Sequence, residues 1–332
     1  MNNKQPLVSI CIPTYNRAQY LKKGLDSIVC LPEFLDGTVN VWISDNCSTD
    51  DTEQLCKQYT EKYNGIHYHR NSTNVVNENF SIVMSLADGV LLKLCNDTVI
   101  YNSNALKIFC DACIKYREEK PLLFFANNNQ VILRKNINQD ILSFEDFYSK
   151  VSYVSTYSVY FSLWKEDFNL FGNDRSGAEL YLWQVSQICK VLNHKNRGVI
   201  IPDLFCDVQS VDKKDISYGL YQVFYVNYLS ILKPYVDSEK LSIQCYELQR
   251  RELLLNFFPS WIAKWKMQEK SLCYSEEEDL KQKVVEAYKN ESYLNQFFTL
   301  YKKILFKLVI KKYLTKIKNS IQNHIQKMKH YS

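Results

Sequence analysis

The first hundred residues alternate between short apolar runs and longer segments whose apolar residues recur with helical spacing. The short runs are rich in β-branched residues and predict strands, whereas the segments between them predict amphipathic helices. In one such segment Tyr20, Leu21, Leu25 and Ile28 fall on a single helical face. The predicted strands are Leu7–Ile12, Val39–Ser44, Ile66–His69 and Val90–Leu94, and the predicted helices are Arg17–Cys30, Asp50–Tyr63 and Asn77–Ala87.

Strands that alternate with helices predict βαβ units, and hence an α/β fold with a mostly parallel sheet flanked by helices. Beyond residue 215 the pattern is helical. We therefore predict an α/β domain over residues 1–215 and a helical C-terminal region over residues 216–332. The later predicted elements are a helix at Asn104–Glu119, a strand at Leu122–Ala126, an apolar stretch at Tyr153–Trp164, a helix from Glu179 to about Leu192 and a strand at Val199–Ile201.

Polar residues follow the first two predicted strands at the point where each strand ends. The first strand is followed by Pro-Thr-Tyr-Asn-Arg at residues 13–17, and the second ends in Ser44, Asp45 and Asn46. In an open α/β sheet ligands bind beyond the carboxyl ends of the strands, and the helix N-termini that follow favour phosphate groups. These residues predict a nucleotide site. The alternative is that Asp45 and Asn46 form a turn and cap a helix, as we expect of Ser48 and Asp50.

Composition narrows the class of protein. Hydrophobic residues make up 46% and charged residues 23% of the 332 residues, which is ordinary for a globular protein. No run of 18 apolar residues predicts a transmembrane helix, and the N-terminus lacks the layout of a signal peptide. The 11 cysteines are scattered through apolar patterns, which favours a reducing compartment over a disulfide framework. We expect a cytoplasmic protein.

The net charge of +5 is unevenly distributed. Residues 292–332 contain nine lysines and no Asp or Glu, and their apolar residues keep a helical face. A basic amphipathic helix of this kind suits an anionic membrane surface, which would make the protein peripheral on the inner face of the cell membrane. Packing of the apolar face on the rest of the protein is an equal alternative. Nucleic acid is a weaker partner, because no basic module interleaved with aromatic residues is present.

Taken together, the motif at residues 13–17 and the acid that ends the second strand resemble the nucleotide-binding half of GT-A-fold glycosyltransferases of the inverting family 2. The resemblance covers about residues 6–205. It implies that Asp45 reads the edge of the nucleobase, and that Asn79, in the stretch Asn77–Phe80, reaches the diphosphate or the ribose. A helix-capping role for Asn79 is equally open. The residues that the resemblance places around the base and ribose are Pro13, Thr14, Tyr15, Asn16 and Arg17.

The metal motif of this family is altered here. Relatives carry Asp-x-Asp after the fourth strand, whereas this chain has Cys95, Asn96, Asp97 and Thr98. A Mg²⁺ or Mn²⁺ ion on a sugar diphosphate needs only one or two carboxylates, so Asp97 could suffice, with Asn96 or Thr98 as a neutral ligand. Cys95 is a soft ligand poorly suited to Mg²⁺. The resemblance implies a divalent cation; metal-free catalysis or a degenerate site are the alternatives.

A catalytic base is the remaining requirement. Many relatives carry Glu-Asp, two further residues and Leu-Trp at the start of a helix beside the acceptor. Aligning Leu182 and Trp183 on that pattern places Glu179 where the family's general base stands. Glu179 could instead be an ordinary acid in the first turn of the predicted helix. Asp174 is the second candidate for the base.

Other chemistry is not indicated. His67 and His69 alternate in a predicted strand without metal-ligand spacing, and the Cys-x-x-Cys of Cys110 and Cys113 lies in a helical pattern without a partner pair. No phosphate-binding loop of the P-loop or dinucleotide type is present.

The resemblance therefore implies sugar transfer with inversion from a nucleotide sugar, a UDP-sugar being favoured, to a hydroxyl of a glycan acceptor. The acceptor class it suggests is a lipid-linked bacterial surface polysaccharide of capsule or O-antigen type. A second hypothesis is a catalytically weak GT-A-fold scaffold docked on the membrane within a glycan-assembly complex, which the altered metal motif keeps open.

Overall fold

The computed structural model describes residues 5–127, 140–141, 143–151, 161–174, 176–212, 214–216, 218–267, 272–274 and 279–329. Contacts divide the chain into two compact units. The first comprises Met1–Val211 with Asn227–Tyr246, and the second comprises Asp212–Val226 with Glu247–Ser332. The domain boundary near residue 215 stays a prediction. Most of the apolar stretch predicted at Tyr153–Trp164 lies outside the described residues.

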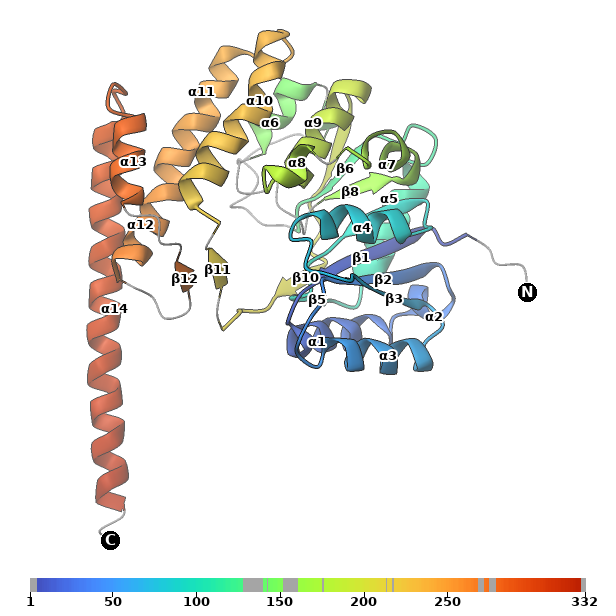
Figure 1. The fold of residues 1–332 in the computed structure, drawn as a ribbon, viewed down its shortest axis with the longest axis horizontal. Helices are drawn as coiled ribbons and strands as arrows, with labels where there is room; N and C mark the ends of the chain where they lie inside the picture. The colour runs from blue at the N-terminus through green and yellow to red at the C-terminus, as the bar shows by residue number, and fades with distance from the viewer. Residues whose placement is uncertain are drawn as a thin grey trace. The chain divides into compact units, whose positions relative to one another are not determined.

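A five-stranded sheet forms the centre of the first unit (Figure 1). Its order is β3-β2-β1-β4-β8, in which the first four strands are parallel and β8 is antiparallel to β4. The predicted mostly parallel sheet is therefore confirmed. The strands are β1 (Val8–Thr14), β2 (Val39–Asp45), β3 (Ile66–Arg70), β4 (Leu91–Leu94) and β8 (Ser162–Trp164).

Helices cover both faces of this sheet, with α1 and α3 on one face and α4 on the other (Figure 1). Each follows a strand, as the sequence predicts. The helices are α1 (Ala18–Ile28), α3 (Thr52–Lys62), α4 (Glu78–Leu86) and α5 (Ala105–Lys115), with the short α2 (Pro32–Leu35) before β2.

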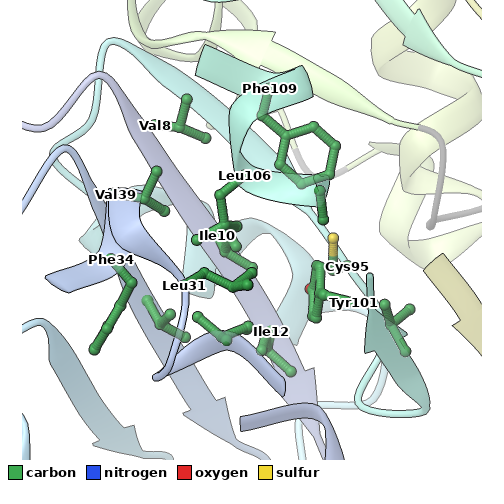
Figure 2. Close-up of a cluster of buried hydrophobic side chains, with 14 of the residues drawn as sticks. Val8, Ile10, Ile12, Leu31, Phe34, Val39, Cys95, Tyr101, Leu106 and Phe109 are labelled. Carbon is green, nitrogen blue, oxygen red and sulfur yellow. The ribbon is translucent and has the colours of Figure 1, made fainter. Parts of the chain in front are cut away.

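The main core lies between the sheet and one helical layer (Figure 2). Side chains that alternate along β1, such as Ile10 and Ile12, meet Leu106 and Phe109 of α5 there. Cys95, which follows β4, also lies in this core beside Tyr101 and is fully buried. The thiol of Cys95 therefore points into the core and not toward the edge of the sheet.

The buried Lys93 holds the end of β4 in place. Its Nζ donates to the carbonyl oxygens of Leu94 and Phe161, at 3.0 and 3.3 Å. Three phenylalanine rings face the same nitrogen at 5.3–5.5 Å, and burial lowers the pKa of the amine. These contacts offset the cost of burying a cation two residues before Cys95.

Further elements extend the first unit. β5 (Val99–Tyr101) pairs antiparallel with β10 (Cys206–Val208), and β9 (Gly198–Ile201) pairs parallel with β6 (Leu122–Phe125) and antiparallel with β7 (Asp140–Ile141). The sequence pattern predicted β6 and β9 but neither β5 nor β10. The additional helices are α6 (Phe144–Lys150), α7 (Lys165–Phe171) and α10 (Tyr228–Asp237).

The predicted helix from Glu179 to Leu192 begins later than expected. Residues 176–179 form a separate short helix, α8 (Ser176–Glu179), and the long helix is α9 (Trp183–Lys195). Tyr181 lies between them with a φ of 60°, a left-handed conformation that interrupts the helical path. The prediction that Glu179 opens the long helix is therefore wrong: Glu179 ends α8.

The second unit is mainly helical, as predicted, apart from the parallel pair β11 (Lys214–Ile216) and β12 (Leu272–Tyr274). The first turns of α14 bury Phe297 and Tyr301 against this unit, whereas residues 306 and 309–321 are exposed. No helix in the described part of the chain combines the length and the apolar character needed to span a membrane. The helices are η3 (Gln222–Asn227), α11 (Ile243–Glu252), η4 (Leu253–Phe257), α12 (Phe258–Met267), α13 (Leu280–Ala287) and α14 (Leu294–Lys329).

Candidate active site

The predicted nucleotide residues meet at the carboxyl ends of β1, β2 and β4. Because β2 and β4 lie on opposite sides of β1, the strand order reverses between β1 and β4. Ligands of open α/β sheets bind outside this switch point. We call this region the donor edge and define it by Thr14, Arg17, Asp45, Asn79 and Asp97.

The loop after β1 is fastened to the loop after β2. The Asn46 N–H donates to the Thr14 carbonyl at 2.9 Å, and the Asn16 N–H donates to Ser48 Oγ at 2.9 Å. Asn16 has a φ of 51°, a left-handed conformation that asparagine tolerates, and its Oδ1 accepts from the Thr49 N–H at 2.7 Å. Of the motif side chains, Tyr15 remains exposed and Pro13 half-buried.

Asp50 caps two helices at once. One carboxylate oxygen accepts from the Ala18 N–H at the start of α1, and the other accepts from the Thr52 N–H at the start of α3, both at 3.1 Å. The predicted capping role of Asp50 is confirmed. Ser48 instead holds Asn16, so its predicted role as a helix cap is wrong.

Asp45 is fully buried and its carboxylate is engaged inside the protein. One oxygen accepts from the Ser48 N–H and the other from the Tyr68 hydroxyl, each at 2.9 Å. Arg70 Nε lies 3.7 Å from the second oxygen. The turn that the sequence offered as the alternative is therefore present. Recognition of a nucleobase by Asp45 stays a prediction.

Asn79 joins α4 to β2. Its Oδ1 accepts from the Ser44 hydroxyl at 2.6 Å and from Asn71 Nδ2 at 2.9 Å, and its Nδ2 donates to the Ser44 carbonyl at 2.9 Å. The helix cap of α4 is Asn77, and Asn79 lies inside the helix. The capping alternative for Asn79 is wrong, and its contact with a diphosphate or ribose stays a prediction.

Asp97 carries the only carboxylate of the altered metal motif, and both of its oxygens have protein partners. Oδ2 accepts from the Thr14 hydroxyl at 2.9 Å, and Oδ1 accepts from Arg17 Nη1 at 3.1 Å. Burial raises the pKa of the Asp97 carboxyl, an effect opposed by Arg17 and Thr14. Each of these residues was a candidate from the sequence, but their contact with one another was not predicted.

The residues of the metal motif do not fit a divalent cation well. The side chain of Asp97 is only 5% exposed and already paired, and Cys95 lies in the core. Asn96 is half-buried and Thr98 is buried. Over the residues that the structure describes, no cluster of three or more His, Cys, Asp or Glu side chains could hold a metal ion. The divalent cation expected from the resemblance would therefore have one carboxylate ligand here, and both oxygens of that carboxylate already have protein partners.

The two candidate bases lie in a different setting. Glu179 is exposed and, within the described ranges, has no hydrogen-bond or ion-pair partner, whereas the neighbouring Leu182 and Trp183 are fully buried. Asp174 forms an ion pair with Lys190 of α9. The buried Leu-Trp pair fixes the segment in place, which leaves Glu179 at the surface.

Three residues at the donor edge were missed by sequence analysis. Tyr68 and Arg70 lie at the end of β3 and Asn71 follows it. They bond to Asp45, to the Ser48 carbonyl and to Asn79, respectively. Their position after a third parallel strand was the available signal. His67 and His69 lie in β3, as predicted, and Cys110 and Cys113 are buried in α5.

Comparison with known proteins identifies the family that this part of the chain resembles. The family model "Glycosyl transferase family 2" matches residues 9–120. Over these residues the chain is similar to glycosyl transferase family 2. The matched segment holds every residue of the donor edge but ends before Asp174 and Glu179. The expected resemblance to family 2 is confirmed over residues 9–120.

Curated relatives match only a short part of this chain. Abequosyltransferase RfbV of Salmonella typhimurium is 46% identical over 86 residues, which are 25% of this chain and 25% of that protein. The uncharacterized glycosyltransferase MG025 homolog of Mycoplasma pneumoniae is 40% identical over 62 residues, 19% of this chain and 20% of its own length. The chain thus aligns with a quarter or less of these relatives.

Solved structures resemble the chain over most of its length. Residues 1–349 of S. aureus TarS give a TM-score of 0.54 at 15% identity, covering 89% of this chain and 90% of that one. The mannosyltransferase PcManGT of Pyrobaculum calidifontis, in complex with GDP-Man and Mn²⁺, gives a TM-score of 0.50 at 12% identity, covering 92% and 88%. At these identities the likeness shows the fold, which is the predicted GT-A α/β fold.

Proposed function

We propose that this chain transfers a sugar from a nucleotide-sugar donor to a hydroxyl group of a glycan acceptor. The observation that carries the proposal is that the segment matched by the family 2 model contains the whole donor edge, at the switch point of the sheet. TarS with UDP-GlcNAc and PcManGT with GDP-Man have the same fold, which supports a nucleotide sugar as the donor. Among donors we favour a UDP-sugar.

Glu179 is the proposed general base. Its carboxylate takes the proton of the acceptor hydroxyl while the acceptor oxygen bonds to the anomeric carbon. The bond from that carbon to the diphosphate oxygen breaks, and its electron pair leaves with the nucleoside diphosphate. A single displacement of this kind inverts the anomeric configuration. Exposure of Glu179 leaves its carboxylate accessible to an acceptor, whereas Asp174 is already paired with Lys190.

The proposed acceptor is a lipid-linked bacterial surface glycan of capsule or O-antigen type. Its support is the 46% identity, over 86 residues, to the abequosyltransferase RfbV of Salmonella typhimurium. The carboxylate expected to hold a divalent cation is already paired with Arg17 and Thr14.

The exposed part of α14 is proposed to bind an anionic membrane surface from the cytoplasmic side. Its large apolar side chains remain in solvent between residues 306 and 321: Phe306, Val309, Ile310, Tyr313, Leu314, Ile317 and Ile321. Lys307, Lys311 and Lys312 lie among them and are exposed. Apolar insertion combined with lysine attraction suits a headgroup region, whereas a second copy of this helix would bring like charges together.

Thermal unfolding with a panel of nucleoside diphosphates and nucleotide sugars tests the function. A ligand at a hundred times its Kd stabilises the folded state by about 2.7 kcal/mol, so one nucleotide class should raise Tm while adenosine and free sugars do not. Absence of any nucleotide shift would contradict the proposal. If the protein binds a nucleotide but turns over no nucleotide sugar, the scaffold hypothesis is favoured. That hypothesis rests on the altered metal motif around Asp97.

A further inference from the structure

We propose that the guanidinium of Arg17, oriented by Asp97, neutralises the departing diphosphate, in place of a divalent cation. The inference rests on the proposed function and identifies the positive charge that stabilises the leaving diphosphate. It moves Arg17 from the base and ribose pocket, where the family resemblance put it, to the phosphates.

The position of the ion pair points to a ligand. Thr14 and Arg17 come from the end of β1, and Asp97 comes from the loop after β4, so the cluster bridges the two strands between which the order reverses. This is the place in an open α/β sheet where a nucleotide's phosphates are expected. Arg17 also directly precedes α1, whose N-terminus adds positive potential and whose first turn holds no acid.

The two partners of the ion pair differ in exposure. The side chain of Asp97 is 5% exposed, whereas that of Arg17 is 34% exposed. An incoming anion therefore meets the guanidinium and not the carboxylate. Within the described residues, Asp97 is the only side-chain partner of Arg17, which leaves further N–H donors for phosphate oxygens. A planar guanidinium can bind two phosphate oxygens at once.

The same contacts disfavour a metal at this point. A cation bound by Asp97 has to displace Arg17 or Thr14 from a carboxylate with almost no exposed surface. The thiol of Cys95, at the first position of the motif, lies in the core with Tyr101 (Figure 2). In the altered motif, Cys95 at the first position is therefore buried in the core, and the carboxylate of Asp97 is paired with Arg17.

The consequence for the reaction is electrostatic. When the bond between the anomeric carbon and the phosphate oxygen breaks, the electron pair stays on the diphosphate. A fixed cation at that oxygen stabilises the developing charge without reorganising. Asp97 does not touch the donor in this account; it is a positioning residue that holds Arg17 in place.

The test is calorimetric titration of the full-length protein with UDP and with UMP, or with GDP and GMP if the thermal panel favours guanosine, in Mn²⁺ and in EDTA. We expect wild type to bind the diphosphate about equally in both. Arg17→Gln should lower diphosphate affinity roughly 10- to 100-fold and monophosphate affinity less, because one charge-assisted contact is lost. The diphosphate affinity of Arg17→Lys should lie between those of wild type and Arg17→Gln.

A paired variant separates binding from folding. Arg17→Gln leaves a buried carboxylate unpaired, so Arg17→Gln with Asp97→Asn removes both charges and should fold while still losing the diphosphate preference. Asp97→Asn alone removes the partner that orients Arg17 but keeps the guanidinium charge, so it should weaken metal-independent diphosphate binding, by less than Arg17→Gln does. The role of Arg17 would be overturned if Mn²⁺ raised the diphosphate affinity of the wild-type protein about tenfold or more and Asp97→Asn abolished that increase. The proposed function would then still stand. Absence of nucleotide binding in wild type under all conditions would overturn both.

Discussion

The donor edge and the segment around Glu179 carry similar polar side chains in opposite physical states. At the donor edge, Asp45, Asn79 and Asp97 are buried and hydrogen-bonded to neighbouring residues of the protein, and the family 2 model matches all of them. Glu179 is exposed, unpartnered within the described residues and outside the matched segment. The difference suggests that the donor site is built before the nucleotide arrives, whereas the acid that faces the acceptor is held only through its buried neighbours Leu182 and Trp183.

The largest effect is expected on the acceptor side. Glu179→Gln should preserve nucleotide affinity and reduce sugar transfer by ~10²–10⁴-fold, because the amide keeps the size of the side chain but cannot accept a proton. Transfer rate and nucleotide affinity are measured on the same preparation. Asp174→Asn is the matched control and should retain most of the activity. Near wild-type turnover in Glu179→Gln, with loss in Asp174→Asn, would move the base to Asp174.

A comparably large effect is expected at the surface of α14. Changing Lys307, Lys311 and Lys312 to Gln should lower partitioning onto anionic liposomes by roughly 3 kcal/mol, or about 10²-fold, because each lysine near such a surface contributes about 1 kcal/mol. Nucleotide affinity should be unchanged. The control changes Lys22, Lys57 and Lys107, which are exposed on α1, α3 and α5.

Cosedimentation at low and high salt measures this binding, since added salt screens exposed charges. Full-length protein that ignores anionic liposomes even at low salt would contradict the membrane proposal. An equal loss of liposome binding in the two triple variants would instead mean that the net charge of the protein drives binding, and not the lysines of α14.

A smaller effect is expected at the buried end of β2. If Asp45 reads the nucleobase, Asp45→Asn should weaken nucleotide binding by roughly 1.5–3 kcal/mol, because a charged acceptor is lost. Tyr68→Phe removes an internal partner of the same carboxylate and keeps the charge. Calorimetry on both variants distinguishes the two interpretations. An equal loss of affinity in Tyr68→Phe would mean that Asp45 only shapes the turn.

The smallest effect is expected at Asp50, which bonds to the starts of the two helices that follow the loops after β1 and β2. Asp50→Ala should lower the free energy of unfolding by about 1–2 kcal/mol, because it removes a cap from the starts of α1 and α3. Denaturant unfolding measures the change. Asp51→Ala is the matched control, since the exposed Asp51 makes no side-chain capping bond and should be nearly neutral. Equal losses in the two variants would contradict the capping account.

The sequence predicted the parts of this fold that depend on local pattern. β1, β2 and β4 are apolar runs buried on both faces of the sheet, and α1 shows helical spacing, so each could be located from its own residues. β5 and β10 could not, because they pair across about a hundred residues and each is only three residues long. The break at Tyr181 also escaped prediction, since a single left-handed residue leaves no apolar signal.

The candidate site divides in the same way. Residue types after each strand predicted which side chains gather at the donor edge. Sequence could not predict which of them bond to each other: Arg17 and Asp97 are 80 positions apart, and their contact depends on the order of β1 and β4 in the sheet. Asp97 was therefore interpreted as a free metal ligand, although the fold supplies it with an arginine.

The most direct test of the central claim, that the donor edge binds a nucleotide, is a crystal structure of the full-length protein with the nucleoside diphosphate that raises Tm most. We expect the diphosphate to lie beyond the carboxyl ends of β1 and β4, with phosphate oxygens within hydrogen-bond distance of Arg17, and the base to lie toward the end of β2. A nucleotide bound anywhere else on the molecule would contradict it.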